Sequence, residues 1–241
     1  MKKTFLVLIL FFLINLVSSQ EKEPALNSTH RLDIEWWKER HEEKMLSPQI
    51  NPRLVLLGNS ILHTLDYSDR NDVWQKYLRK YRALNLGFSG DRTENVIWRL
   101  ENGEIDNVEP KLVLLLIGTN NTDGNHFLSI TQPDELQNAV WKITRIIRNK
   151  LPEAKILLLG ILPYGYKANY RDNLNKKTNT YLADFPKKDD NIIYKDIGEI
   201  FFDDQGKVDK TLMPDYLHPN AAGHLLMFKT LEPVIEELIG E

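Results

Sequence analysis

The sequence contains no cysteine among its 241 residues. Disulfide bonds therefore cannot hold the fold together, and no cysteine is available for lipid attachment. A strong excess of charge is also missing: removing residues 1–19 takes away Lys2 and Lys3 and no acid, which leaves 29 basic and 34 acidic residues and a net charge of −5. That sign argues against nucleic acid or an anionic membrane as the main partner.

Signatures of metal and nucleotide binding are missing as well. The six histidines are scattered, and His41, His63 and His224 have no neighbour at a spacing typical of metal ligands. No glycine-rich phosphate-binding loop is present. We therefore expect neither a metal nor another cofactor.

The first 52 residues predict export followed by a short N-terminal extension. Residues 1–19 have the pattern of a cleaved signal peptide, with Lys2 and Lys3, an apolar run and small residues near Ser19. The alternative is a membrane anchor, but the apolar run is shorter than the roughly 20 residues that a membrane span needs. We expect a secreted or periplasmic protein without stable membrane insertion, with residues 20–52 forming a leader and a helix. Within them, residues 21–29 predict a mobile leader and residues 33–45 an amphipathic helix.

The remainder of the chain, 53–241, has the size and apolar content of one globular domain. Its apolar runs alternate with segments of helical periodicity, which predicts a three-layer α/β fold with a doubly wound parallel sheet of about five strands. The runs near 53–58, 81–86, 111–117, 155–162 and 191–195 predict strands. Segments around 73–78, 93–102, 132–151, 169–184 and 223–238 predict helices, the second of them capped by Thr93.

Four blocks carry residues that could perform chemistry. They are Gly58-Asn-Ser60, Gly87-Phe-Ser-Gly-Asp-Arg-Thr93, Gly118-Thr-Asn-Asn121 and Asp215-Tyr-Leu-His218. The first three follow apolar runs, so in a parallel sheet they lie at the carboxyl ends of strands, where ligands bind in open α/β folds. A serine hydroxyl needs a base and a group that orients the base, and Asp215 and His218 are spaced so that the carboxylate could hold the imidazole. The alternative is structural, with Asp215 capping a turn and His218 on the surface.

Together these blocks resemble the SGNH hydrolases, also called GDSL-type esterases, from about Arg53 to the C-terminus. Within that superfamily the sequence is similar to the platelet-activating-factor acetylhydrolase catalytic subunits and their secreted bacterial relatives. The resemblance implies a flavodoxin-like fold, with Ser60 as nucleophile, His218 as base and Asp215 as its partner. It also implies an oxyanion hole formed by the backbone N–H groups of Ser60 and Gly90 and by the side-chain amide of Asn120.

Two positions leave alternatives open. Ser89 is a rival nucleophile in Gly87-Phe-Ser-Gly90, although the glycine that the Gly-x-Ser-x-Gly elbow requires is replaced by Asp91. The family's first block reads Gly-Asp-Ser, whereas Asn59 stands here in place of the aspartate. Because residue 59 moves no proton, we expect an active enzyme with a modestly altered pH profile. We also include Asn59 among the predicted substrate-binding residues, with His126, Tyr164 and Tyr166; Phe127 is a further candidate.

The predicted function is a secreted esterase that removes short acyl groups, with acetyl as the expected group, from a small-molecule or polysaccharide ester. An acetylated carbohydrate is the first expectation. A lipid-like acetyl ester is the first alternative, and thioesters and lysophospholipids are further ones. From a different class, the chain could be a degenerate carbohydrate-binding protein, with Asn59 as the sign of lost activity. The sequence gives no oligomeric state.

Overall fold

A computed structural model describes residues 24–46 and 51–240. The predicted signal peptide, residues 1–19, lies outside the described residues. Within the described ranges, no helix combines the length and the apolar character needed to cross a membrane.

Five parallel strands form the central sheet, as predicted. In chain order they are β1 (Leu54–Gly58), β2 (Leu84–Gly87), β3 (Leu112–Leu116), β4 (Lys155–Leu159) and β5 (Ile192–Lys195). Their spatial order is β2-β1-β3-β4-β5, and every pair of neighbours is parallel. The chain moves outward from β1 to β2 and then crosses back to β3 on the other side of β1. Ligands bind at such a reversal, beyond the carboxyl ends of the two inner strands.

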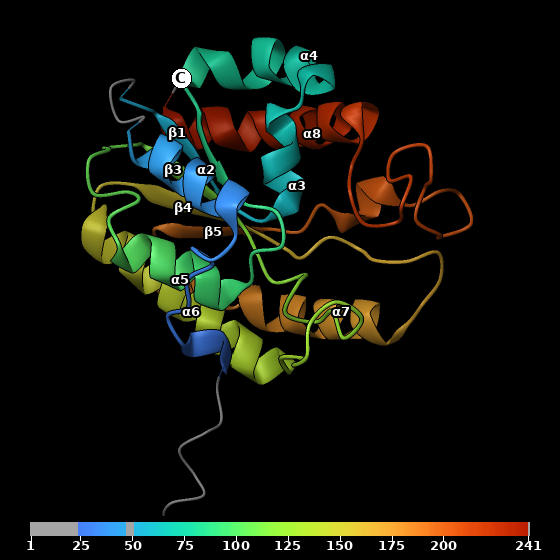
Figure 1. Ribbon diagram of the computed structural model, residues 1–241. Helices are drawn as coiled ribbons and strands as arrows, with labels where there is room; N and C mark the ends of the chain where they lie inside the picture. The colour runs from blue at the N-terminus through green and yellow to red at the C-terminus, as the bar shows by residue number, and fades with distance from the viewer. Residues whose placement is uncertain (1–23, 47–50, 241) are drawn as a thin grey trace, which may run out of the picture.

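Helices cover both faces of the sheet, which gives three layers (Figure 1). One face carries α3 (Ser60–His63), the helical segment that begins with α4 (Asn71–Val73), and α8 (Ala221–Ile239). The opposite face carries α5 (Thr93–Glu101), α6 (Pro133–Lys150) and α7 (Tyr170–Leu182). The α4 segment continues as a π-helical turn at Trp74–Leu78 and a 3-10 turn at Arg79–Tyr81. Further short 3-10 turns are Thr64–Asp66, Ser68–Arg70, Phe185–Lys187 and Gly198–Phe201.

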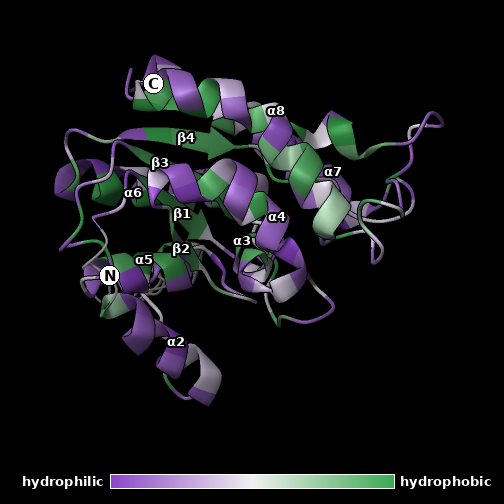
Figure 2. Ribbon diagram, turned by 90° about the horizontal axis from the view of Figure 1, so that it is seen from above, coloured by the Kyte–Doolittle hydropathy of each residue, from purple (hydrophilic) through white to green (hydrophobic). Residues whose placement is uncertain are grey.

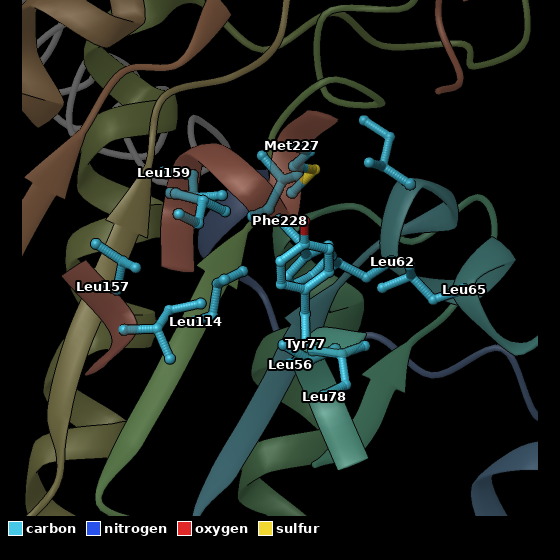
Figure 3. Packing of buried hydrophobic residues seen from close by; sticks show 14 of the residues in the cluster. Leu56, Leu62, Leu65, Tyr77, Leu78, Leu114, Leu157, Leu159, Met227 and Phe228 are labelled. Atoms are coloured by element: carbon cyan, nitrogen blue, oxygen red, sulfur yellow. The ribbon is translucent and has the colours of Figure 1, made fainter. Parts of the chain in front are cut away.

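The two cores follow from side chains that alternate across each strand. Leu54 and Leu56 point to the α8 side, where Figure 3 shows Leu56 and Leu114 packing with Phe228 and Met227. Val55 and Leu57 point to the α5 and α6 side. Because the inner strands are covered on both faces, their sequences are continuous apolar runs rather than alternating ones.

The described part of the N-terminal extension packs against the domain, which differs from the mobile leader predicted for residues 21–29; residues 21–23 of that prediction lie outside the described residues. Pro24–Leu26 forms a 3-10 turn, Ala25 is fully buried, and the Thr93 hydroxyl donates to the Ala25 carbonyl oxygen at 3.0 Å. Helix α2 (Glu35–Met45) forms near the predicted range, but Figure 2 colours it mainly as hydrophilic. Within this helix, the Trp37 side chain is fully buried against the domain.

Two predicted boundaries were wrong for local reasons. The second strand begins at Leu84 rather than Tyr81, because Arg79–Tyr81 closes a 3-10 turn and Arg82 has a left-handed φ of 49°. Thr93 does not cap α5 but is its first residue. Arg92 occupies the cap position, and its backbone N–H donates to the Asn95 side-chain oxygen at 2.9 Å.

Candidate active site

An open cavity of about 590 Å³ lies at the carboxyl ends of β1, β2 and β3. It brings together Ser60, Gly90, Asn120 and His218, which come from four separate blocks of the sequence. The remaining lining residues mix polar, charged and aromatic side chains: Thr64, Tyr67, Arg70, Ser89, Asp123, His126, Phe127 and Leu217.

Ser60 is the first residue of α3, immediately after strand β1 and its Gly58-Asn59 turn. The turn is tight: a Cβ on Gly58 would lie 2.0 Å from the Leu116 carbonyl oxygen, so only glycine fits. The Asn59 side-chain oxygen caps α3 by accepting a hydrogen bond from the Ile61 N–H at 3.0 Å. As the first helical residue, Ser60 has a backbone N–H without an acceptor inside the helix, and no backbone acceptor for it is found among residues 24–46 and 51–240.

His218 and Asp215 occupy the loop that precedes α8. The His218 Nε2 atom is 2.8 Å from the Ser60 Oγ atom, and its Nδ1 atom is 2.6 Å from the Asp215 Oδ2 atom. The backbone N–H groups of Leu217 and His218 donate to the other carboxylate oxygen, Oδ1, at 3.1 and 2.7 Å. Partial burial opposes ionisation of Asp215, but the hydrogen bonds from His218 outweigh it and hold the pKa of this carboxyl below its usual value.

That ionised carboxylate fixes the tautomer of His218. An acceptor at Nδ1 requires the proton to reside there, so Nε2 presents its lone pair to the Ser60 hydroxyl. The arrangement can therefore withdraw the hydroxyl proton as Ser60 attacks an electrophile.

Gly90 and Asn120 stand on the side of the cavity formed by the loops after β2 and β3. Gly90 has a left-handed φ of 77°, a conformation that favours glycine. The Asn120 side-chain amide donates one hydrogen to the Asp91 carbonyl oxygen at 2.9 Å. An amide carries two hydrogens, so the second remains available to a ligand.

Other predicted site residues divide into those at the cavity and those away from it. His126 and Phe127 line the cavity, with His126 Nδ1 held 2.8 Å from Asp123 Oδ2. Tyr164 and Tyr166 do not line it, because they follow β4, a strand further from the crevice. The Arg171 guanidinium stacks over Tyr164. Tyr166 packs edge-on against Tyr216, which lies in the loop that carries Asp215 and His218 (the histidine loop).

Asn59 also lies away from the cavity, so its predicted contact with substrate is corrected. Its side chain is 1% exposed and caps α3. Its Nδ2 atom is buried without a hydrogen-bond partner among the described residues. The departure from the family's aspartate therefore concerns the support beneath Ser60 rather than the binding surface.

A second serine–histidine pair borders the same cavity. The Ser89 Oγ atom is 2.8 Å from His63 Nδ1, and the Ser89 backbone N–H donates to the same nitrogen at 3.1 Å. Burial, helped by the charge of Arg40, lowers the pKa of His63 to about 4. A nitrogen that binds protons this weakly is a poor general base, and no carboxylate is hydrogen-bonded to this histidine among the described contacts. The geometry thus favours Ser60 over Ser89 as the activated serine.

Sequence reasoning missed the charged side chains that support the site. Arg70 lines the cavity and donates to the Pro219 carbonyl oxygen at 3.2 Å and to His224 Nδ1 at 3.4 Å. His224 in turn donates from Nε2 to the Ile61 carbonyl oxygen at 2.9 Å, which ties the histidine loop to α3. Behind the loop that carries Gly90, Arg99 is fully buried between Asp91 and Glu104. Isolated arginines in a sequence carry no signal for such contacts.

Comparisons with known proteins identify the family and the fold. The model of the GDSL-like lipase/acylhydrolase family matches residues 56–226. The rat platelet-activating factor acetylhydrolase IB subunit alpha2 is 30% identical over 206 residues, which is 85% of this chain and 86% of that protein. Among solved structures, a putative acylhydrolase from Bacteroides fragilis superposes with a TM-score of 0.68 at 17% identity, covering 88% of this chain and 99% of that one. An acetyl xylan esterase superposes with a TM-score of 0.59 at 17% identity, covering 76% and 98%. At such identities the two structures show a shared fold.

Proposed function

The chain belongs to the GDSL-like lipase/acylhydrolase family and is an ester hydrolase, and on this premise we propose that it removes acetyl groups from O-acetylated carbohydrate outside the cytoplasm. The single observation that carries the mechanism is the hydrogen-bonded series Asp215–His218–Ser60, with distances of 2.6 and 2.8 Å. Export rests on the sequence of residues 1–19.

In the first half of the reaction, Ser60 Oγ attacks the ester carbonyl carbon while His218 Nε2 takes the hydroxyl proton. The negative charge that develops on the carbonyl oxygen is met by the N–H groups of Ser60 and Gly90 and by the Asn120 amide. The bond to the alcohol oxygen then breaks, and the imidazolium returns its proton to that oxygen. In the second half, water loses a proton to His218 and attacks the carbonyl carbon of the acyl-enzyme. The bond from that carbon to Ser60 Oγ then breaks, the imidazolium returns its proton to Ser60 Oγ, and acetate leaves.

The cavity offers polar groups that suit a polar alcohol. Arg70, Asp123 and His126 border it, although most of its lining surface is apolar. Tyr67 lines the cavity and is 52% exposed, and an exposed aromatic ring suits stacking on a sugar face. An acetyl xylan esterase shares the fold, which agrees with this substrate class.

A lipid-like acetyl ester is the second candidate, and one surface feature favours it. Leu128 is fully exposed and Ile130 partly exposed, next to Phe127 at the cavity. Together with the resemblance to platelet-activating factor acetylhydrolase subunits, these apolar side chains would suit contact with a lipid.

The test measures acetate release from acetylated xylo-oligosaccharides and from an acetylated ether phospholipid, with p-nitrophenyl acetate and octanoate as a chain-length pair. We expect the oligosaccharide to be the better acetyl donor and the octanoate to be a poor substrate. Ser60→Ala should abolish turnover, whereas Ser68→Ala, which changes an exposed serine outside the cavity, should not. Preferential hydrolysis of the phospholipid would select the second candidate. Absence of acetate release from every ester would contradict both.

A further inference from the structure

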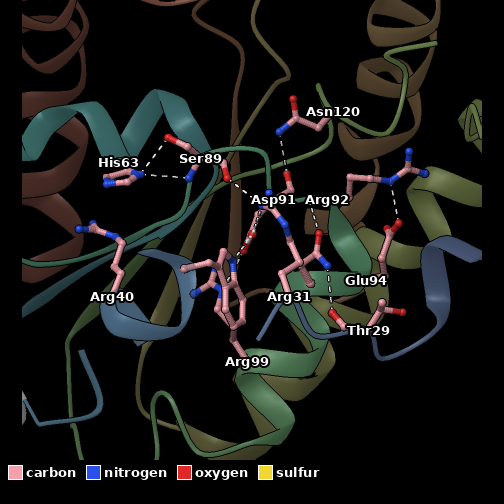
Figure 4. A network of polar contacts seen from close by, with 12 residues as sticks. Thr29, Arg31, Arg40, His63, Ser89, Asp91, Arg92, Glu94, Arg99 and Asn120 are labelled. Atoms are coloured by element: carbon pink, nitrogen blue, oxygen red, sulfur yellow. Dashed lines mark hydrogen bonds and ion pairs between the residues drawn. The ribbon is translucent and has the colours of Figure 1, made fainter. Parts of the chain in front are cut away.

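Arg31, from the N-terminal extension, contacts the back of the loop that carries Gly90. Its Nη1 atom donates to the Ser89 carbonyl oxygen at 2.8 Å and lies 3.1 Å from Asp91 Oδ1. Figure 4 shows Arg31 meeting the Ser89–Asp91 loop beside Asn120. The guanidinium is not among the described residues that line the cavity, so it supports the loop without touching a ligand.

The contact fixes the orientation of one peptide unit. In a trans peptide the carbonyl and the following N–H point in opposite directions. When Arg31 holds the Ser89 carbonyl, the Gly90 N–H is directed away from the guanidinium. Within residues 24–46 and 51–240, that N–H has no backbone acceptor, and Gly90 borders the cavity.

The packing at Gly90 confirms how closely the guanidinium approaches. A Cβ at position 90 would lie 3.0 Å from Arg31 Nη1 and 3.1 Å from Nη2, in addition to the strain of a φ of 77°. The space beneath Gly90 is therefore occupied by the arginine. A side chain at position 90 would displace it.

Two further anchors hold the neighbouring peptide units. His63 Nδ1 accepts from the Ser89 N–H at 3.1 Å, and the Asn120 amide donates to the Asp91 carbonyl oxygen at 2.9 Å. These two hydrogen bonds therefore fix the loop on either side of Gly90. Arg31 is the anchor that acts directly on the Ser89–Gly90 peptide.

The rest of the extension holds Arg31 in place. The Ile34 N–H donates to the Arg31 carbonyl oxygen at 2.9 Å and begins the turn into α2. On α2, the fully buried Trp37 donates from Nε1 to Asp91 Oδ1 at 2.7 Å. Trp37 and Arg31 therefore share one carboxylate oxygen, but only Arg31 also holds the Ser89 carbonyl.

We propose that Arg31 is a positioning residue for the oxyanion hole, which orients the Gly90 N–H toward the carbonyl oxygen of the substrate. The proposal rests on the hydrolase mechanism above. It assigns to the N-terminal extension a function in transition-state stabilisation, although no residue of the described range 24–46 lines the cavity. A displacement of about 1 Å in such a donor can cost up to about a hundredfold in rate.

The test compares Arg31→Ala and Arg31→Lys with the full-length wild type on p-nitrophenyl acetate. We expect Arg31→Ala to lower kcat by about 10-fold to 100-fold and to leave KM within about twofold, because the lost contact serves the transition state. A trifluoromethyl ketone inhibitor, which forms a tetrahedral adduct, should bind the variant correspondingly less well. Arg31→Lys keeps one donor and should recover part of kcat, and millimolar guanidinium should partly rescue Arg31→Ala.

Trp37→Phe is the matched control. It removes the other side-chain donor to Asp91 Oδ1 and leaves the Ser89 carbonyl contact intact. We expect it to lower the urea midpoint while kcat stays within about twofold of wild type. An equal loss of kcat in Trp37→Phe and Arg31→Ala would overturn the proposal, because the effect would then act through Asp91. An unchanged kcat in Arg31→Ala would also overturn it, whereas an inactive wild type would contradict the mechanism itself.

Discussion

The loop that carries Asp215 and His218 differs sharply from the loop that carries Gly90. In the acid–base loop, the side chains of Asp215 and His218 are 56% and 32% exposed. Behind the oxyanion loop, the side chains of Asp91 and Arg99 are fully buried. A proton relay needs two hydrogen bonds and exchange with water, whereas an oxyanion donor is effective only if it is already in place. The fold accordingly places a fully buried ion pair, Asp91 with Arg99, behind the Gly90 loop.

Replacing His218 tests the exposed half of this comparison and should have the largest effect. His218→Ala removes the proposed base, and we expect kcat to fall by about 10⁴-fold or more. Because the side chain is partly exposed, the free energy of unfolding should change by less than about 1 kcal/mol. Turnover and urea denaturation of the same preparation give both numbers. A large loss of stability would contradict the contrast between the two loops.

Replacing Arg99 tests the buried ion pairs behind the Gly90 loop. Arg99→Met leaves Asp91 and Glu104 buried without their shared cation, so we expect the free energy of unfolding to fall by about 3–5 kcal/mol. Arg145→Met is the matched control, because the Arg145 side chain is 47% exposed and pairs with Asp189 at 3.2 Å. That control should cost less than about 1 kcal/mol. Similar losses in the two variants would remove the distinction.

Asn120 contacts both the buried support and the cavity. Its amide donates to the Asp91 carbonyl oxygen, and its side chain lines the cavity. Asn120→Ala removes one oxyanion donor, and we expect about a hundredfold or greater loss of kcat, equivalent to about 3 kcal/mol of barrier. KM should change little. A steady-state comparison in which KM alone rises would instead assign Asn120 to ground-state binding.

His224 extends the buried support beneath the histidine loop, and its titration predicts how stability depends on pH. Burial, with Arg70 contributing, lowers the pKa of His224 from 6.5 to about 4. The unfolded chain therefore binds the proton more readily between these values. Stability from this group is complete above pH 6.5 and is lost as the pH falls toward 4, by up to about 3 kcal/mol.

Urea midpoints between pH 4 and 7 measure that dependence, with His224→Gln as the variant that cannot titrate. Wild type should lose more stability across the interval than the variant does. His63, whose pKa is also lowered to about 4, adds a slope of the same sign to both proteins. Parallel pH dependences would show that His224 does not contribute.

The smallest effect is expected at Asn59, whose side chain caps the helix that begins with Ser60. Asn59→Asp keeps the acceptor that caps α3, so turnover should change by less than about threefold. The added negative charge favours a protonated imidazole, so the acid limb of the rate profile should move to higher pH by less than about one unit. If wild type is inactive and Asn59→Asp creates turnover, the natural protein is a degenerate esterase.

The sequence predicts the sheet well because its signal is local. Each inner strand is a short apolar run ended by glycine or a polar turn, and five such runs alternate with helical segments. The spacing of Asp215 and His218 is a local signal as well, whereas their pairing with Ser60 was expected from the resemblance of the four blocks to the SGNH hydrolases. The positions of Tyr164 and Asn59 were not, because they depend on which strand each loop follows and on which side chain the turn buries.

The support behind the oxyanion loop could not be predicted from local pattern. Arg31 and Asp91 are 60 positions apart, and Arg31 lies in a polar stretch that predicts no fixed structure. Ion pairs between distant residues depend on the complete fold rather than on periodicity. For this reason the acid–base residues appeared in the sequence, whereas the residue that we propose to orient Gly90 appeared only in the structure.

Covalent labelling tests the central claim most directly. A fluorophosphonate reacts with a serine that is activated by a base, and peptide mapping by mass spectrometry identifies the modified residue. We predict a single adduct on Ser60 in wild type, retained in Ser68→Ala and lost in Ser60→Ala and His218→Ala. An unmodified wild type, or an adduct on Ser89 instead of Ser60, would contradict the account.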